Sequence, residues 1–164
     1  MATVPFRVEV VRSTRRTRTV GARLVGSVLR VSVPSWMSAA EERRWVDDMT
    51  TRFARQIESS LVDLEERAAV LARRHGLRPP KSIRWVDNMQ SRWGSCTPST
   101  GSVRLSTRLA RFPEWVRDYV IVHELAHLTY PGHTPAFWKL VDRYPKAERA
   151  RGYLIAKSGD DETE

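Results

Sequence analysis

Three of the four histidines in this 164-residue chain fall within one short segment, His123-Glu124-Leu125-Ala126-His127 followed by His133. At this composition the pattern H-E-x-x-H is expected by chance about 0.006 times per chain, so chance is a poor explanation. Residues i and i+4 of a helix share one face, which lets His123 and His127 offer two imidazole nitrogens to one ion about 2.0–2.1 Å away. The spacing therefore predicts a metal site on a helix.

Glu124 stands one step around the same predicted helix. Its carboxylate can reach a metal-bound water without being a ligand, which suits a general base. Catalytic zinc usually has three protein ligands and one open position. We prefer His133 as the third ligand because the Pro131-Gly132 pair ends the helix and lets the chain fold back. Glu148, on a later predicted helix, is the competing candidate.

The alternative is a helix whose histidines are merely packed. Apolar residues such as Val122 and Leu125 would then bury His123 and His127. Each unpaired buried polar group costs ~1–3 kcal/mol. A shared metal ion removes this cost for both histidines, so the metal interpretation is favoured.

Other side chains near the predicted site carry weaker signals. Arg92 and the neighbouring Trp93 are candidates for lining the cleft beside the metal. Arg92 is the preferred substrate contact, because packing in the framework is an equally good interpretation of Trp93. Asp118 is a candidate for orienting an imidazole, although a salt bridge on the helix face is the favoured role. Tyr130 is a candidate for stabilising an oxyanion, although packing in the core or at its rim is the favoured role. We expect Phe137-Trp138, which fits helical core spacing, to be structural.

The elements before this site follow from hydropathy and turn residues. Residues 6–33 are β-like and predict two or three antiparallel strands. Ser38 with Glu41 forms a capping box that opens a long helical stretch ending at Gly76. Because that stretch is long, we expect a break near Ser59-Ser60.

From Lys81 onward the pattern turns from β to α. A strand at 83–86 precedes a hairpin, in which 92–96 pairs with 102–106 across a turn. Helices are expected from Glu114 to about Tyr130, after Thr134-Pro135, and from Pro145. We predict one α+β domain over 1–157, made of N-terminal strands (1–37), a helical segment (38–76) and a zinc-binding core (81–157). Residues 158–164 are expected to be a disordered acidic tail.

Composition narrows the function classes. Hydrophobic residues make up 41% of the chain and charged residues 29%, which is typical of a globular protein. Because Cys96 is the single cysteine, an internal disulfide and cysteine-rich zinc modules are excluded. Cys96 is a candidate for approaching the metal, but the favoured role is that of a small buried hydrophobic residue. The net charge of +9 makes nucleic acid or nucleotides candidate partners. Arginines 12, 15, 16 and 18 form either a solvated loop or an anion-binding edge.

The chain resembles the YgjP-like metallopeptidase-domain family of bacteria in several segments. These are Ser91-Arg92-Trp93-Gly94-Ser95-Cys96, the pair Asp118-Tyr119 leading into the H-E-L-A-H helix, His133, and the pair Phe137-Trp138. The resemblance is close over about 80–155, and a distant similarity to SprT-type proteases is also seen. It implies a small zincin-like α+β domain with a short antiparallel sheet, one zinc ion on His123, His127 and His133, and Glu124 as the catalytic residue. A metzincin proper is excluded, because all four methionines precede the site.

Three hypotheses of function follow. The preferred one is a zinc metallopeptidase in which a metal-bound water, activated by Glu124, attacks a peptide carbonyl. The alternatives are a metal-dependent hydrolase of nucleotide phosphoanhydrides and a non-catalytic zinc-fold binding module. We also expect a monomer. A location in the cytoplasm is expected because the sequence shows neither a signal peptide nor a membrane span.

Overall fold

The computed structural model describes residues 4–158, which form two compact units that divide after Ile57. The first unit contains strands β1 (Arg7–Ser13), β2 (Gly21–Val25) and β3 (Val28–Pro34) and most of helix α1 (Ala39–Ser60). The second contains the other strands and helices. The single-domain organisation expected over 1–157 stays a prediction.

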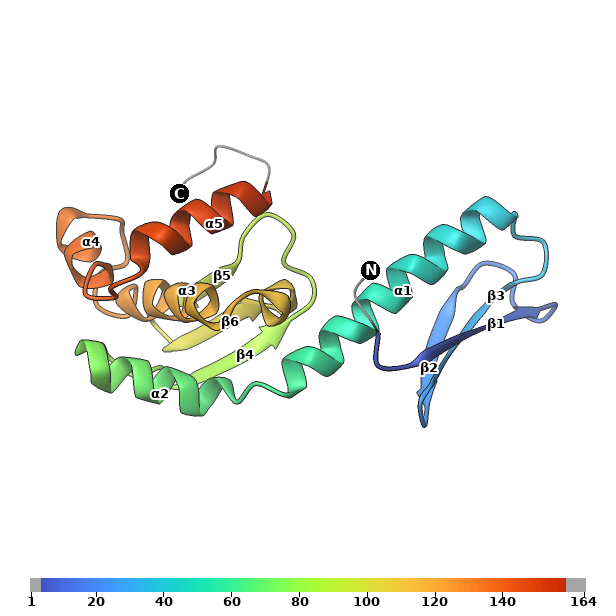
Figure 1. Ribbon diagram of the computed structural model, residues 1–164, viewed down its shortest axis with the longest axis horizontal. Coiled ribbons are helices and arrows are strands. Elements are labelled where there is room, and N and C mark those ends of the chain that lie inside the picture. The colour runs from blue at the N-terminus through green and yellow to red at the C-terminus, as the bar shows by residue number, and fades with distance from the viewer. Residues whose placement is uncertain (1–3, 159–164) are drawn as a thin grey trace. The chain divides into compact units, whose positions relative to one another are not determined.

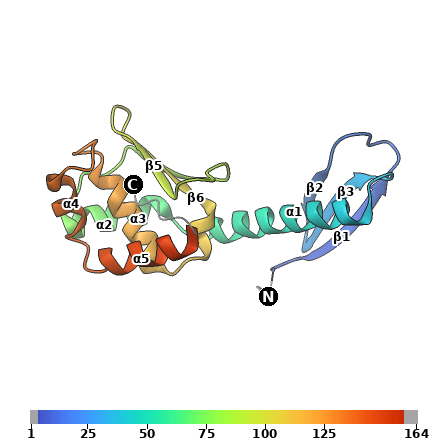
Figure 2. The ribbon, with the colours of Figure 1, turned by 90° about the horizontal axis from the view of Figure 1, so that it is seen from above.

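The first sheet has the order β1-β3-β2. Strands β2 and β3 form an antiparallel hairpin, whereas β1 is parallel to β3. The expectation of purely antiparallel strands is therefore wrong. The reason is that β1 and β2 run in opposite directions and flank β3 on its two edges, so only one of them can be antiparallel to it. Helix α1 covers one face of this sheet, where its apolar residues pack on Leu29, Val31 and Val33 (Figure 2).

The predicted capping box and helix break are both confirmed. The Ser38 hydroxyl donates to the Glu41 carboxylate at 2.6 Å, and the Glu41 amide donates back to Ser38 Oγ at 3.3 Å. Helix α1 ends at Ser60, and α2 (Leu64–His75) begins after Asp63, which caps it through the Glu66 amide. Gly76 ends α2 with a φ of 64°, a conformation that glycine adopts without strain.

The second sheet consists of β4 (Ser82–Val86), β5 (Gly94–Thr97) and β6 (Ser102–Ser106) in the order β4-β6-β5. The hairpin β5-β6 is antiparallel as expected, but β4 is parallel to β6. The sheet is thus mixed rather than purely antiparallel. The chain reverses direction between β4 and β5 and again in the hairpin, so β6, which lies between them, runs parallel to β4. A short 3-10 helix, Thr107–Arg111, leads from β6 to the remaining helices.

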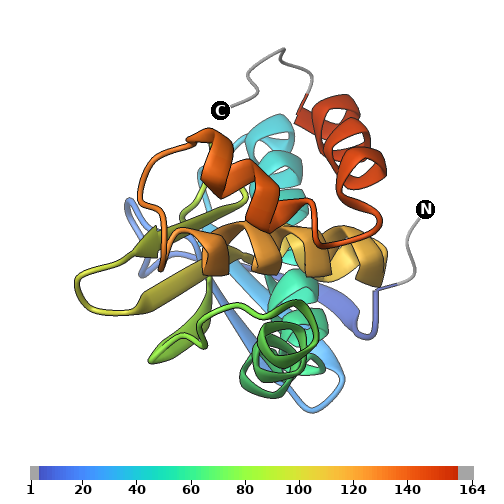
Figure 3. The same cartoon turned by 90° about the vertical axis from the view of Figure 1, so that its left-hand side faces the viewer.

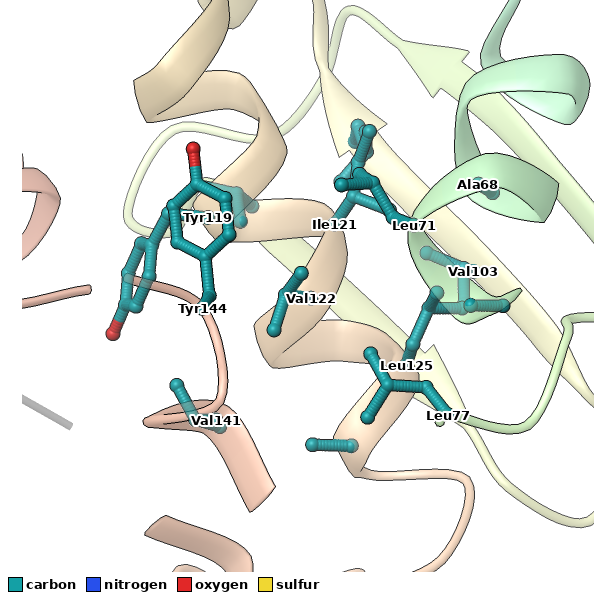
Figure 4. Close-up of a cluster of buried hydrophobic side chains, with 14 of the residues drawn as sticks. Ala68, Leu71, Leu77, Val103, Tyr119, Ile121, Val122, Leu125, Val141 and Tyr144 are labelled. Carbon is teal, nitrogen blue, oxygen red and sulfur yellow. The ribbon is translucent and has the colours of Figure 1, made fainter. Parts of the chain in front are cut away.

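Helices α3 (Glu114–Ala126), α4 (Pro135–Val141) and α5 (Ala147–Ser158) complete the second unit. Helix α2 lies beside α3, and α4 and α5 lie on the opposite side of α3 (Figures 1 and 3). Side chains from α2, β6 and α3 meet in the core, among them Leu71, Val103 and Leu125 (Figure 4). The α+β class is confirmed.

Several expected boundaries differ in the structure. Strand β5 spans Gly94–Thr97 rather than 92–96, and α5 begins at Ala147 rather than at Pro145. Helix α3 ends at Ala126 rather than near Tyr130, because tighter turns through 127–130 replace its regular hydrogen bonds. Ser158, assigned to the tail, is the last residue of α5, and the rest of the predicted acidic tail lies outside the described residues. Within residues 4–158 the structure holds no helix with the length and apolar character needed to span a bilayer.

Candidate metal centre and cleft

The predicted histidines meet at the C-terminal end of α3. His123 lies in the last full turn of the helix, His127 caps its end, and His133 returns on the loop to α4. One ring nitrogen from each histidine lies within 4.8 Å of the others, and the Nε2 atoms of His123 and His133 are 3.3 Å apart. The loop after α3 thus brings three imidazoles from separate turns of the chain to one point.

The ring of His127 has a defined orientation. Its Nδ1 lies 3.1 Å from the main-chain carbonyl oxygen of Tyr130. A carbonyl only accepts hydrogen bonds, so Nδ1 carries the proton and donates it. Nε2 is therefore left with a lone pair, the form in which histidine binds a metal.

Burial favours the neutral form of His123 and His127. Loss of solvation, and to a smaller extent the neighbouring His127 and His133, lowers the pKa of His123 to about 3. Burial also lowers the pKa of His127, although its hydrogen bond to Tyr130 opposes the shift. The neutral form is the one in which an imidazole can bind a metal ion.

Glu124 extends beside the histidines into the narrow space between α3 and β5. It is only 6% exposed, and burial raises the pKa of its carboxyl to about 8, while the positive charge of Arg92 lowers it. A carboxyl with a pKa near neutrality can both accept and return a proton at working pH. The side chain borders a cleft of ≈ 720 Å³ that also reaches His123 and Trp138.

Gly94 makes room for that carboxyl. A Cβ atom built at Gly94 would lie 2.7 Å from Glu124 Oε1 and 2.8 Å from its Cγ. Both distances are shorter than van der Waals contact allows, and Glu124 is held on a buried helix face. The glycine of the R-W-G-S-C segment is therefore required by the side chain of Glu124.

We expect Gly94→Ala to displace the Glu124 carboxyl and to lower hydrolytic activity at least about tenfold, since small misplacements of catalytic groups are costly. Metal content should not change, because no histidine is touched. The control is Gly152→Ala, which lines the same cleft but has no atom within 4 Å of the added Cβ. Equal activities of the two variants in a peptide-cleavage assay would contradict this role of Gly94.

The pKa of Glu124 also predicts a pH dependence of stability. In the metal-free folded protein the carboxyl keeps its proton up to about pH 8, whereas the unfolded chain releases it near pH 4.5. The folded state binds more protons between these values, so its stability from this group falls as pH rises through that window. Urea unfolding of the metal-free protein and of Glu124→Gln should give a stability difference that changes with pH in this direction. A pH-independent difference would refute the raised pKa.

The remaining predicted residues divide between the cleft and the scaffold. Arg92 lines the cleft and is exposed. Tyr130 acts on the site through its main-chain carbonyl, and its side chain is 37% exposed. Cys96 is half-buried on β5, where burial raises the pKa of its thiol to about 11, as expected for a packed cysteine. Glu148 lies outside the group of converging ligand atoms, and its exposed carboxylate pairs with Arg151.

Asp118 does not orient a histidine. It is buried, with both carboxylate oxygens bound by the Arg67 guanidinium of α2, and the Arg67 Nε to Asp118 Oδ1 distance is 2.7 Å. This is the salt bridge on the helix face that the sequence favoured for Asp118. Its role is to join α2 to α3 behind the site.

Two aromatic residues that we expected to be only structural touch the histidines. Phe137 is fully buried and stacks on His127, with ring centroids 4.4 Å apart. Trp138 stacks on His133, with ring centroids 5.5 Å apart and an interplanar angle of 21°. The signal available in the sequence was their spacing of four and five residues after His133. These rings fix the planes of two imidazoles.

The ligand set fits a zinc ion. Tetrahedral zinc with Zn–N distances of about 2.0–2.1 Å separates its ligand nitrogens by about 3.3–3.4 Å. The observed 3.3 Å between the Nε2 atoms of His123 and His133 agrees with that separation. Three imidazole donors beside a buried carboxyl also fit a site with an open position better than a closed structural site.

A zincin-like α+β fold with three converging histidines beside a buried glutamate defines the class of zinc metallopeptidase-like hydrolases. The chain belongs to the YgjP-like metallopeptidase domain family, whose model matches residues 37–156. No curated protein matches the chain significantly.

Two crystal structures are similar to this chain. One is the metallopeptidase zymogen of Pyrococcus abyssi abylysin, with 21% identity and a TM-score of 0.52 over 58% of this chain and 94% of that one. The other is the metallopeptidase zymogen of Methanocaldococcus jannaschii jannalysin, with 18% identity and a TM-score of 0.49 over 58% and 97% of the two chains. At this identity the likeness to abylysin concerns the fold.

Proposed function

We propose that the protein is a zinc-dependent peptidase in which His123, His127 and His133 hold the ion and Glu124 is the general base. The observation that carries the proposal is the convergence of three imidazole nitrogens within 4.8 Å beside a buried carboxyl. A zinc ion bound there supplies a Lewis acid that polarises a carbonyl and acidifies water.

The chain's own groups perform the proton transfers. Glu124, unprotonated, accepts the proton of the attacking water and then donates it to the amine that leaves from the cleaved peptide bond. Its low exposure excludes bulk water, so the proton stays on this carboxyl between the two steps. Arg92 at the cleft offers a positive charge to the substrate and favours the unprotonated form of Glu124.

Strand β5 gives an extended peptide a place to bind. It is an edge strand of the sheet β4-β6-β5, and its first residue, Gly94, touches Glu124. An edge strand offers unpaired amides and carbonyls to which an extended peptide can add as a further strand. A peptide bound there would run past the general base, which favours peptides over other substrates of this site.

The proposed ligands predict a specific metal loss. We expect about one zinc ion per chain in the untagged protein and none in His127→Ala, by plasma mass spectrometry. Folding should persist in this variant, because a core of this size does not depend on the ion. The control is His75→Gln, which replaces the histidine outside the cluster. Retention of zinc by His127→Ala, or its complete unfolding at room temperature, would contradict the assignment.

The two alternative functions are separated by assays on the zinc-loaded protein. Cleavage of casein or of a peptide library supports the peptidase. Phosphate or pyrophosphate release from nucleoside triphosphates would instead favour the phosphoanhydride hydrolase, for which Arg92 and Arg151 line the cleft. If neither reaction occurs, the non-catalytic binding module becomes the favoured function.

A further inference from the structure

The part of the chain before Trp36 forms an arginine-rich surface that plays no part in the proposed peptidase mechanism. Strands β1 to β3 precede the part of the chain matched by the family model, which begins at residue 37. Residues 1–57 contain eleven arginines, no lysine and five acidic residues. The first compact unit is therefore strongly basic by itself, apart from the metal centre.

The sheet β1-β3-β2 has one covered face and one open face. Leu29, Val31 and Val33 point to the face covered by α1. The alternate residues of β3, Arg30 and Ser32, point the other way, and neither α1 nor its apolar side chains pack there. The open face thus carries polar side chains of β3, Arg30 and Ser32.

Arginines gather on that open face. Arg23 lies beside Arg30 in the register of β2 and β3, and Gly21 lies beside Ser32. The guanidinium of Arg16 lies over Gly21, with Nη2 3.0 Å from the position of a Cβ. Arg16, Arg23 and Arg30 together line a hollow of ≈ 330 Å³. Three guanidinium groups around one hollow attract an anion.

Only part of this positive charge is neutralised. Arg30 pairs with Glu9 at 3.3 Å, and Arg16 donates to the Thr19 hydroxyl at 3.2 Å. Within residues 4–158 no ion pair is made by Arg15, Arg18 or Arg23, all of them exposed. The positive charges of these three side chains are therefore available to an anionic partner.

An exposed tryptophan lies beside the arginine-rich segment that connects β1 to β2. Trp36 is 64% exposed, and its indole Nε1 donates to the carbonyl of Thr17, between Arg16 and Arg18, at 3.1 Å. The backbone on either side is also held, because Arg12 donates to the carbonyls of Ser35 and Met37 at 3.0 Å each. A ring that is fixed in place yet largely in solvent is a preformed stacking platform.

We propose that the surface formed by Trp36, Arg15, Arg16, Arg18 and Arg23 binds single-stranded nucleic acid without sequence preference. The guanidinium groups bind phosphates, and Trp36 stacks on an unpaired base. Arginines beside an oriented aromatic ring match the alternating phosphates and bases of a single strand. A lipid surface or an acidic protein offers charge but no flat base for the ring.

The test is fluorescence anisotropy of the full-length, zinc-loaded protein with a labelled oligothymidylate of about 20 nucleotides, longer than usual site sizes. Trp36→Ala should weaken binding about 5- to 150-fold, the range that corresponds to the loss of one base–aromatic stack. The control is Trp45→Ala, since Trp45 is also exposed, at 43%, but lies on α1. Thermal melting of each variant checks the fold, and Trp36→Phe, which keeps a ring, should retain most of the affinity.

A second pair of variants measures the phosphate contacts. The triple variant Arg15→Ala/Arg16→Ala/Arg18→Ala should reduce the slope of log affinity against log salt by about 2, at about 0.7 per phosphate on a single strand. The control triple Arg43→Ala/Arg44→Ala/Arg52→Ala removes the same charge from α1, and its slope should not change.

Three results would overturn the proposal. They are equal binding by the two triple variants, binding of an abasic strand as tight as that of oligothymidylate, and binding to anionic phosphatidylserine vesicles that depends on Trp36 when binding to the oligonucleotide does not. None of these results bears on the metal centre, since its residues all lie in the second unit.

Discussion

Glu124→Gln is expected to lower peptide hydrolysis by about 10²- to 10⁴-fold while zinc stays bound, the range typical for removal of a general acid–base group. Glutamine has nearly the same shape and fits the same space against Gly94, but it cannot accept the proton of the attacking water. The three histidines lie outside the change, so their converging nitrogens are preserved. The measurements are kcat/KM on a peptide substrate and zinc content by plasma mass spectrometry.

Glu148→Gln is the matched control. Glu148 borders the same cleft, but its carboxylate is exposed and bound to Arg151. We expect a change of less than about threefold, since exposed ion pairs contribute little. If the two variants lose activity equally, or if Glu124→Gln stays active, Glu124 is not the base. Loss of zinc only from Glu148→Gln would restore Glu148 as the third ligand.

Arg67→Ala is expected to lower the free energy of unfolding by about 3 kcal/mol, because breaking a buried ion pair leaves a charge without a partner. Asp118 is 4% exposed, and both of its oxygens are bound by Arg67. Arg67 also contacts Glu114 at 3.0 Å, so one guanidinium joins α2 to two positions of α3. The measurement is urea unfolding at neutral pH.

Arg73→Ala provides the comparison on the same helix. Arg73 is exposed, and its replacement should change the unfolding free energy by less than about 0.5 kcal/mol. The double variant Arg67→Met/Asp118→Leu should be more stable than Arg67→Ala, since no buried charge is left without a partner. A loss below about 1 kcal/mol in Arg67→Ala would mean that Asp118 is solvated when unpaired.

The sequence predicted the elements whose signals are local. The Ser38–Glu41 capping box, the break after Ser60 and the hairpin of β5 and β6 each depend on neighbouring residues, and all three are confirmed. Strand direction was predicted less well. The parallel pairing of β1 with β3 and of β4 with β6 depends on which edge of a strand is free, which no local pattern encodes.

The histidine spacing by itself determined that His123 and His127 share a helix face, because the α-helical repeat places residues four apart together. Only the tertiary structure brought His133 to within 3.3 Å of His123, through a loop whose path depends on α4 packing against α3. It also decided that Asp118 binds Arg67. The stacking of Phe137 on His127 and the space that Gly94 leaves for Glu124 likewise depend on tertiary packing. Such contacts join residues far apart in the chain, so packing of whole elements, rather than local propensity, decides them.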